Sequence, residues 1–407
     1  MITPAYSPTA TERVLPRMAL DFTTGVLDPR VTVTRALDTA TRVNSSGYIE
    51  AVNANLPRFD YNQTTLAPKG LLIEEARTNI VLQSSDASQI PWTPAFGGVG
   101  TLAVVTPNAG VSPDGTSNAV RVQFDCTNAS SSSNRSRIQQ IVTLINGTTY
   151  SKGVWVKAYD ASNVGKTIRF LVEGVSGTLV YTLTDQWVRI SPASGAATGT
   201  SGNFMLETRG TFTGQTADIL MWNATLEAGA FLTSDIITSA TSLTRNADAV
   251  SMTGTNFSDW FNANEGTFVA TTSVLNLAAN RPIMQTTTGG LANGSQYVYY
   301  NPSSSRFGYR VYDATGAAVG AVNYTNAGTP VINTTYGAAI GYKTDSFAIS
   351  VNGAAVGLDT LGTVTGAADA ILIGGDTGPT YLNGHAKSLR FYPLRLTNAE
   401  TQAFSKG

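Results

Sequence analysis

The candidate functional residues of this chain are aromatic side chains rather than nucleophiles. Trp155 and Lys157 have the parity opposite to the apolar positions of the stretch 149–158, and Tyr159 follows at its end. A sugar ring is bound by a flat apolar surface beside hydrogen-bonding groups, so these three residues form a candidate ligand site. The alternative is that Trp155 is covered by the second packed face of a sandwich, by the N-terminal segment or by another subunit.

A second candidate surface is rich in tyrosine. Tyr297 and Tyr299 lie in one strand-like run, Tyr309 and Tyr312 lie in the next, and the turn-forming segment Asn301–Ser305 separates the two runs. This spacing predicts a β-hairpin that is rich in aromatic side chains. An exposed aromatic patch marks an interaction site, which here is either a glycan groove or a subunit interface.

The remaining tryptophans are expected to be structural. Trp187 shares its parity with Arg189 and could stack under it as easily as under a sugar, and we favour packing. Trp222 stands in an apolar run and is predicted to lie in the core. Trp92 and Trp260 lie beside breaks in the sequence pattern, where they are expected to fill domain junctions.

The chain has one histidine and one cysteine, which limits the catalytic possibilities. A serine-histidine-aspartate triad could use only His385, and the sequence has no Gly-x-Ser-x-Gly nucleophile motif. Cys126 continues a strand pattern and is expected to be a small buried hydrophobe. Glu74 and Glu75 are adjacent and would point apart in a strand, so they are not a ready acid and base. We therefore predict that the protein is not an enzyme.

No cofactor is predicted. Zinc and iron-sulfur sites need several Cys or His ligands, which this chain does not have. The sequence also has no close-set Asp-x-Asp pair of the kind that holds calcium, only scattered residues: Asp218, Asp313, Asp345, Asp359 and Asp376. Structural calcium is therefore unsupported, although backbone carbonyls could still supply an oxygen shell.

Charge is balanced and sparse. The chain carries 26 Lys or Arg against 27 Asp or Glu, a net charge of -1, and charged residues make up 13% of it. Nucleic acids and membrane surfaces are bound through clustered Lys and Arg, so we predict no nucleic-acid partner and no membrane insertion. Apolar runs stay shorter than the roughly 18 residues of a membrane span, and residues 1–5 lack the pattern of a signal peptide.

The elements that would position these residues are short strands. Apolar residues alternate through 149–158 and again through 167–173, which predicts strands with one core face. Alternation through 347–351 ends at Asn352-Gly353, which readily supplies the two positive φ angles of a type I′ turn. The best helix signal is the capping box of Thr397-Asn398-Ala399-Glu400. With 39 Gly and 16 Pro and few helical patterns, the chain is predicted to be all-β.

Two breaks divide the chain. The first lies near residue 85, where the sequence turns into Ser84–Ser88, and the second lies near residue 247, after the polar stretch Thr238–Ser242. We therefore predict two antiparallel β-sandwich (jelly-roll) domains in tandem behind an N-terminal segment of strands and loops. The three parts span residues 1–85, 86–247 and 248–407.

Several segments resemble known proteins. Leu226–Ser234, Thr244–Asp248 and Gly254–Trp260 resemble a string that is common in virion proteins of tailed bacteriophages. Upstream, Pro57–Tyr61 and Gly70–Asn79 are similar to the segment that precedes a carbohydrate-binding-module-like jelly roll in the same proteins. The resemblance implies that such a jelly roll follows residue 85.

The C-terminal block resembles a laminin-G or concanavalin-A-like sandwich. The segments that carry this resemblance are Glu265–Val269, Ser350–Gly353, Ile371–Gly375 and Leu389–Thr397. Some glycan-binding sandwiches of these families use calcium held by close-set carboxylates, and this chain departs from that pattern. The resemblance thus implies a sandwich fold without assigning it a calcium site.

Together the resemblances imply a structural protein of the virion surface. It would be a fibre or a head or tail appendage that binds host surface polysaccharide through weak contacts repeated over several copies. Its partners would be other virion proteins, held through residues 1–85, and copies of itself, with a homotrimer favoured. One alternative is a capsid or tail decoration protein that stabilises the particle without binding glycans. A minor alternative is a polysaccharide depolymerase.

Overall fold

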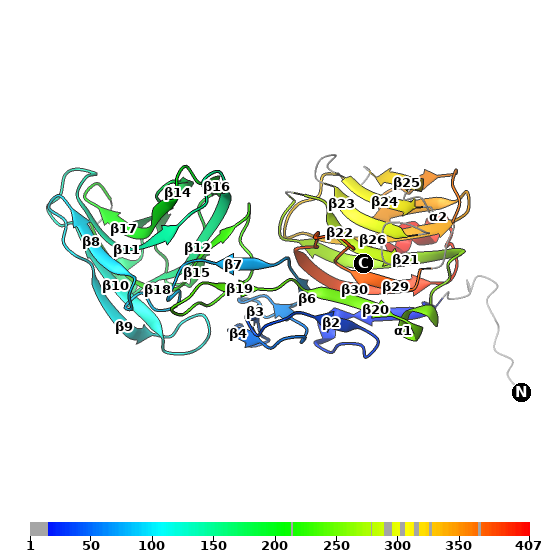
Figure 1. Ribbon diagram of the computed structural model, residues 1–407, viewed down its shortest axis with the longest axis horizontal. Helices are drawn as coiled ribbons and strands as arrows, with labels where there is room; N and C mark the ends of the chain where they lie inside the picture. Colours follow the sequence, from blue (N-terminus) through cyan, green and yellow to red (C-terminus); the bar gives the residue numbers. More distant parts are fainter. Residues whose placement is uncertain are drawn as a thin grey trace, which may run out of the picture. The chain divides into compact units, whose positions relative to one another are not determined.

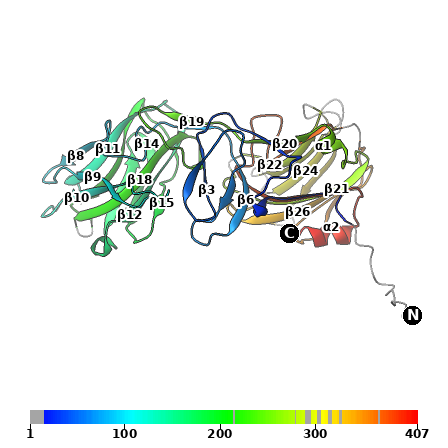
Figure 2. The ribbon, with the colours of Figure 1, turned by 90° about the horizontal axis from the view of Figure 1, so that it is seen from below.

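The computed structural model is all-β and describes residues 15–212, 215–277, 279–288, 295–301, 306–312, 317–324, 328–364 and 368–407. The chain falls into two compact units, whose strands Figures 1 and 2 show. The middle unit consists of Arg35–Ala67 and Ala76–Ala247. The C-terminal unit consists of Pro68–Glu75, Asp248–Gly407 and the described residues up to Thr34. None of the described helices is long and apolar enough to cross a membrane.

The middle unit is built on two antiparallel sheets. Its elements are β3 (Ala40–Val43), β4 (Ile49–Val52), β5 (Phe59–Tyr61), β7 (Arg77–Asn79), β8 (Thr93–Gly97), β9 (Val104–Gly110), β10 (Ala119–Asp125), β11 (Arg135–Thr143), β12 (Thr149–Ala158), η2 (Ala161–Asn163), β13 (Thr167–Val172), β14 (Val175–Thr182), β15 (Val188–Ile190), β16 (Gly195–Ala196), β17 (Ser201–Arg209), β18 (Thr216–Ala228) and β19 (Leu243–Arg245). Sheet I has the order β15–β12–β18–β10–β9, with β16 also paired with β12. Sheet II has the order β14–β13–β17–β11–β8, and β3 pairs with β4 and β7 with β19 outside the two sheets.

The core of the middle unit brings together side chains from both sheets. Val156 of sheet I and Phe170 and Phe204 of sheet II are fully buried and belong to one apolar cluster. The two phenylalanine rings lie 5.0 Å apart between centroids. The alternating stretches 149–158 and 167–173 are thereby confirmed as the strands β12 and β13, each with an apolar face in the core.

Lys152 is a charged exception on the core-facing side of β12. It is fully buried, and its Nζ donates a hydrogen bond to the carbonyl oxygen of Ser176 at 2.6 Å. Burial penalises the ammonium form and lowers the pKa of Lys152 from 10.5 to about 8. The unfolded chain therefore binds a proton that the folded protein has released between pH 8 and 10.5, so this group makes the free energy of unfolding rise with pH across that window.

We expect the substitution Lys152→Met to remove this rise, because it removes the titrating group. Urea unfolding at pH 7.5, 8.5 and 9.5 measures the effect, below the range where tyrosines ionise in the unfolded chain. Lys157→Met on the same strand is the matched control, since Lys157 is half-buried rather than enclosed. An unchanged pH slope in Lys152→Met would contradict the expectation.

The C-terminal unit is also built on two antiparallel sheets. Its elements are β1 (Met18–Asp21), η1 (Phe22–Thr24), β2 (Thr32–Thr34), β6 (Pro68–Ile73), β20 (Ala249–Thr253), α1 (Thr255–Ser258), β21 (Glu265–Val274), β22 (Arg281–Thr287), β23 (Gln296–Asn301), β24 (Arg306–Tyr312), β25 (Ala318–Tyr324), β26 (Thr335–Lys343), β27 (Phe347–Val351), β28 (Gly357–Asp359), β29 (Ala370–Ile373), β30 (Gly384–Tyr392) and α2 (Asn398–Phe404). One sheet contains β28–β27–β26–β21–β30–β6, with β1 also paired with β30, and the other has the order β2–β20–β29–β22–β23–β24–β25.

Local signals in this unit are confirmed at two places. Asn352 and Gly353 have φ angles of 50° and 73°, and the N–H of Ala354 donates to the carbonyl of Val351 at 3.0 Å. These are the features of the predicted type I′ turn. At the C-terminus Thr397 caps α2 in a capping box. The β23–β24 hairpin is confirmed by its antiparallel register, while its tip, residues 302–305, lies outside the described residues.

The N-terminal stretch is divided between the two units rather than forming a segment of its own. In the C-terminal unit β1 and β6 both pair with β30, and β2 pairs with β20. In the middle unit β3 and β4 form their pair, and β7 pairs with β19. Because each of these strands satisfies its backbone hydrogen bonds within one of the units, residues 15–85 are part of the folded bodies. The contact boundary at Asp248 lies beside the sequence break near residue 247.

Candidate functional site

Trp155 of the first predicted site is covered. Its side chain is 9% exposed and packs with Trp222 of the neighbouring strand and Ile49 of β4. Its Nε1 donates to the carboxylate of Asp235, at 3.2 Å from each oxygen. The expectation that β12 has a single core face is therefore wrong at Trp155, because the N-terminal strand β4 covers its second face. Trp155 is therefore covered by the N-terminal segment, which is one of the alternatives given for it in the sequence analysis.

The four tyrosines of the second predicted site are buried. Tyr299 and Tyr309 are at most 1% exposed, and Tyr297 and Tyr312 are 6% and 8% exposed. Tyr297 stacks on Tyr299 with ring centroids 4.6 Å apart, whereas Tyr309 donates its hydroxyl to Oε1 of Gln296 at 3.0 Å. Burial raises the pKa of Tyr297 and Tyr309 above the ordinary value. The expected exposed aromatic patch is therefore wrong, since the tyrosines pack within the unit.

The other tryptophans are structural, but not at junctions. Trp92 is 4% exposed and meets Phe204 edge to face in the core of the middle unit. Trp260 is 2% exposed in the core of the C-terminal unit. Trp222 is buried as predicted, at 1%, and Trp187 packs against the same cluster and donates its Nε1 to the carbonyl of Val111 at 3.0 Å.

The chain's histidine and cysteine both lie inside the fold. Cys126 is fully buried, as predicted, and His385 is 1% exposed in β30, where it pairs with Ser273 of β21. Glu74 is buried, and Glu75 accepts a hydrogen bond from Nδ2 of Asn383 at 2.6 Å. Within the described part of the chain no three His, Cys, Asp or Glu side chains are grouped as metal ligands. Asp313 of the scattered carboxylates lies outside that part.

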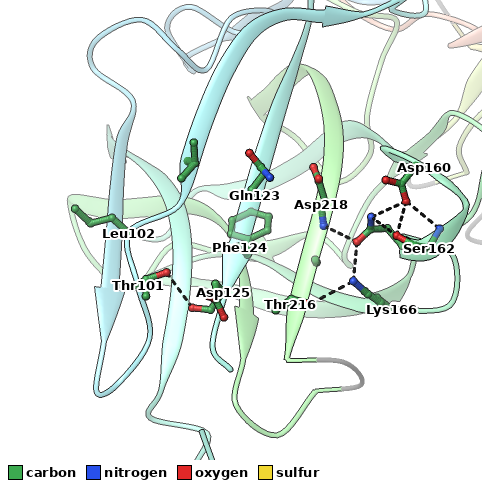
Figure 3. Close-up of a pocket in the computed structure, with 13 residues that line it drawn as sticks. Thr101, Leu102, Gln123, Phe124, Asp125, Asp160, Ser162, Lys166, Thr216 and Asp218 are labelled. Atoms are coloured by element: carbon green, nitrogen blue, oxygen red, sulfur yellow. Dashed lines mark hydrogen bonds between the residues drawn. The ribbon is translucent and has the colours of Figure 1, made fainter. Parts of the chain in front are cut away.

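A polar hollow of about 430 Å³ opens on sheet I of the middle unit (Figure 3). The register of the sheet places its lining, because Gln123 of β10 pairs with Asp218 of β18 and with Val104 of β9. Paired residues of antiparallel strands project to the same side. Further lining comes from residues 101–102, from Asp125 and Thr216, and from η2 with the loop that follows it.

Hydrogen bonds fix the η2 side of the hollow. Asp160 accepts from the backbone N–H of Ser162 at 2.9 Å and from Nδ2 of Asn163 at 2.9 Å. Oδ1 of Asn163 in turn accepts from Nζ of Lys166 at 2.9 Å and from the N–H of Asp218 at 3.0 Å. The hydrogen bonds from Ser162 and Asn163 lower the pKa of Asp160, so it stays ionised. These hydrogen bonds hold the side chains of this wall in place without a ligand.

Tyr159, a residue of the first predicted site, bonds a residue of the hollow wall but does not line the hollow itself. Its ring is 36% exposed, and its backbone N–H donates to the carbonyl of Asp218 at 3.0 Å. The guanidinium of Arg121 lies 3.7 Å from the ring centroid and forms a two-pronged ion pair with Asp218. This pairing raises the pKa of Arg121. Lys157 lies two residue pairs further along the sheet, opposite Leu220, and does not line the hollow.

The side chains that remain available in the hollow suit a neutral polyol. The amide of Gln123 makes no side-chain hydrogen bond within the described part of the chain, and Figure 3 shows it beside Asp218 on the sheet. Leu102 and Val104 are 55% and 57% exposed and give the rim an apolar character. An apolar edge beside amide and hydroxyl groups can hold a sugar. Sequence reasoning missed Gln123 because its strand carries no aromatic residue on that face.

Comparisons with known proteins assign no family. No family model and no curated protein sequence matches this chain. A sialidase of Trypanosoma rangeli in complex with the inhibitor DANA is 18% identical with a TM-score of 0.29, over 39% of this chain and 26% of the sialidase. The Ruminococcus gnavus IT-sialidase CBM40 bound to α2,3-sialyllactose is 13% identical with a TM-score of 0.30, over 35% of this chain and 83% of that chain. The binding domain of botulinum neurotoxin DC in complex with SialylT is 10% identical with a TM-score of 0.30, over 39% and 38%.

Proposed function

We propose that this chain is a structural protein of a phage virion that binds polysaccharide of the host surface through the polar hollow of the middle unit. The virion assignment rests on the resemblance of the segments quoted above. The binding role rests on the hollow itself, and above all on the unused amide of Gln123 beside the exposed Leu102 and Val104. Each such site is shallow, so strength would come from several copies per particle.

The geometry favours binding over bond cleavage. A glycosidase needs one carboxylic acid that is protonated near neutral pH and a second carboxylate beside it. In the hollow, hydrogen bonds lower the pKa of Asp125 and of Asp160, and Asp218 is held in its ion pair with Arg121. The carboxylates of Asp125 and Asp160 are therefore held in the ionised form, which suits hydrogen-bond acceptors for sugar hydroxyls.

We expect Gln123→Ala to weaken binding of purified protein to host-cell polysaccharide by about fivefold or more, because a sugar hydroxyl loses a hydrogen-bonding partner. Biolayer interferometry with immobilised polysaccharide measures the change. Gln186→Ala is the matched control, since Gln186 is an exposed glutamine of the same unit that does not line the hollow. Equal binding by the two variants would place the sugar site elsewhere.

The decoration role makes a different prediction for the unmodified protein. A particle-stabilising protein would show no saturable binding to host cells or their glycans while remaining folded. A depolymerase would release reducing ends from the same polysaccharide, which a binding protein does not do. These two assays therefore separate the three roles.

Assembly on the particle is part of the proposal. We propose contacts with other virion proteins through the N-terminal stretch and association into a homotrimer. Because the strands of residues 18–79 complete sheets of both units, a truncation near residue 85 would remove part of each fold. Light scattering of the full chain after size exclusion is the suitable measurement, and a monomeric mass at micromolar concentration would overturn the trimer.

A further inference from the structure

The outer face of sheet II holds a cluster of arginines that the proposed function does not use. Its members, called the arginine face, are Arg135 and Arg137 of β11, Arg169 of β13 and Arg209 of β17. The register pairs Arg135 with Arg209, and it pairs Glu207 of β17 with both Arg137 and Arg169. Since paired residues project to the same side of a sheet, the four arginines share the face that holds Glu207.

The charge of this face departs from that of the chain. The strands β8, β11, β13, β14 and β17 contain four arginines and a single acidic residue, Glu207. In the whole chain, by contrast, 26 basic residues balance 27 acidic ones. Glu173, after β13, adds one more carboxylate near the face, and its Oε2 accepts from Nδ2 of Asn203 at 2.6 Å. The face as a whole keeps an excess of positive charge.

Two of the arginines are already paired. Oε1 of Glu207 accepts from Nη1 of Arg169 at 3.0 Å and from Nε of Arg209 at 2.7 Å. Glu207 is fully buried, so its charge must be balanced from within the cluster. Arg209 also donates its Nη1 to the carbonyl of Ser132 at 2.7 Å. The side chains of Arg169 and Arg209 are therefore already held by contacts within the unit.

The other two arginines are not held in this way. Within the described part of the chain, the side chains of Arg135 and Arg137 have no oxygen acceptor. The polar contact of Arg137 runs from Nη1 to the thioether sulfur of Met205 at 3.8 Å, and a thioether is a weak acceptor. Both side chains are half-buried, and burial together with the charge of Arg135 lowers the pKa of Arg137. An anion that reached them would gain charge-assisted hydrogen bonds and would displace only the weak contact of Arg137 with Met205.

Other polar atoms of the same face are also unsatisfied. Oε2 of Glu207, Oε1 of Gln139 and Oδ1 of Asn203 are enclosed by their neighbours and have no donor within the described residues. Leu171 pairs with Met205 beside them and adds an apolar strip. These acceptors lie beneath the surface, so the groups that a ligand would meet are the guanidinium groups without acceptors and the half-buried Leu171, which suit the acid group of a sugar.

We propose that the arginine face binds the carboxylate of an acidic sugar unit in a polysaccharide, with Arg135 and Arg137 as the residues that hold the carboxylate. The inference rests on the proposed glycan-binding role for the kind of ligand, but it assigns a second site on the opposite sheet of the middle unit. It also adds a charge requirement that the hollow on sheet I does not have.

The test uses oligogalacturonate as the acidic probe and its methyl ester as a neutral match that differs in the carboxylate alone. Isothermal titration with the full chain is expected to show binding of the acid and at least a tenfold weaker binding of the ester. Raising NaCl from 50 to 500 mM is expected to weaken binding of the acid, since surface charge attraction is screened. Equal affinity for acid and ester, or no binding of either, would overturn the proposal.

Variants locate the site. We expect Arg137→Gln to reduce affinity for the acid at least tenfold, because it removes a guanidinium that binds carboxylate in a fork. Arg42→Gln is the control, since Arg42 belongs to β3 and is paired with Glu50. If Arg137→Gln failed to fold, the comparison of acid and ester on the unmodified protein would still decide the matter.

The two proposals fail in different ways. If binding of host polysaccharide depended on Gln123 but not on Arg137 or on the carboxylate, the proposal for the arginine face would be wrong and the proposal for the hollow would stand. If the acidic oligosaccharide bound through Arg137 but host polysaccharide did not bind at all, the proposed host role would be wrong and the proposal for the arginine face would stand.

Discussion

Replacing Arg58 by alanine is expected to lower the free energy of unfolding of the middle unit by about 3–5 kcal/mol. Arg58 is fully buried, and its Nη1 donates to the carbonyl of Thr41 at 3.1 Å and to Oγ of Ser234 at 2.8 Å. Ser234 also accepts from Nη1 of Arg245 at 2.9 Å. Removal of the guanidinium leaves a cavity and takes a hydrogen-bond donor from the buried carbonyl of Thr41.

This network joins three of the segments on which the resemblance to virion proteins rests. Arg58 comes from Pro57–Tyr61, Ser234 ends Leu226–Ser234, and Arg245 belongs to Thr244–Asp248. The three segments meet at the hydroxyl of Ser234. Their residues therefore hold the N-terminal strands to the sandwich, which is a structural role rather than a binding one.

Tryptophan fluorescence during urea unfolding measures the Arg58 effect, with Trp260→Phe as the background. In that background every tryptophan of the chain lies in the middle unit. Arg42→Ala is the control, because Arg42 pairs with Glu50 at 2.7 Å near the surface and such pairs contribute at most about 1 kcal/mol. A loss for Arg58→Ala no larger than that of the control would show that the network is not stabilising.

Trp260→Ala is expected to destabilise the C-terminal unit by about 3–5 kcal/mol, the usual cost of removing a large buried aromatic side chain. The indole is 2% exposed, and its ring centroid lies 5.0 Å from that of Phe257 and 5.1 Å from that of Phe391. Its Nε1 donates to the carbonyl of Asn256 at 2.8 Å. Removal of the ring opens a cavity in this aromatic cluster.

Amide hydrogen exchange in β21 and β30 measures this loss, because the strands supply Phe268 and Phe391 to the cluster. We expect faster exchange of these amides in Trp260→Ala, by about a hundredfold or more. Trp260→Phe keeps an aromatic ring in place and is expected to lose less than half as much. Unchanged exchange in the alanine variant would mean that the cluster does not limit opening of these strands.

The local structure of this chain follows from short-range patterns in its sequence. The alternation through 149–158 and 167–173, the Asn352-Gly353 turn and the capping box at Thr397 are each encoded by neighbours within a few residues. The structure has these strands, this turn and this capping box, because backbone preference and the two-residue period of a strand depend on no distant contact. The same local patterns are what make the all-β class predictable.

Which faces of the strands are exposed depends on tertiary packing. Strand parity placed Trp155 opposite the apolar side chains of its strand, but Ile49 of β4, about a hundred residues away in sequence, covers it. In the same way, the arginines of sheet II belong to three strands, and only their register brings them around Glu207. Parity states which residues share a face, whereas burial depends on what packs against that face. That packing joins segments whose separation in sequence leaves no local signal.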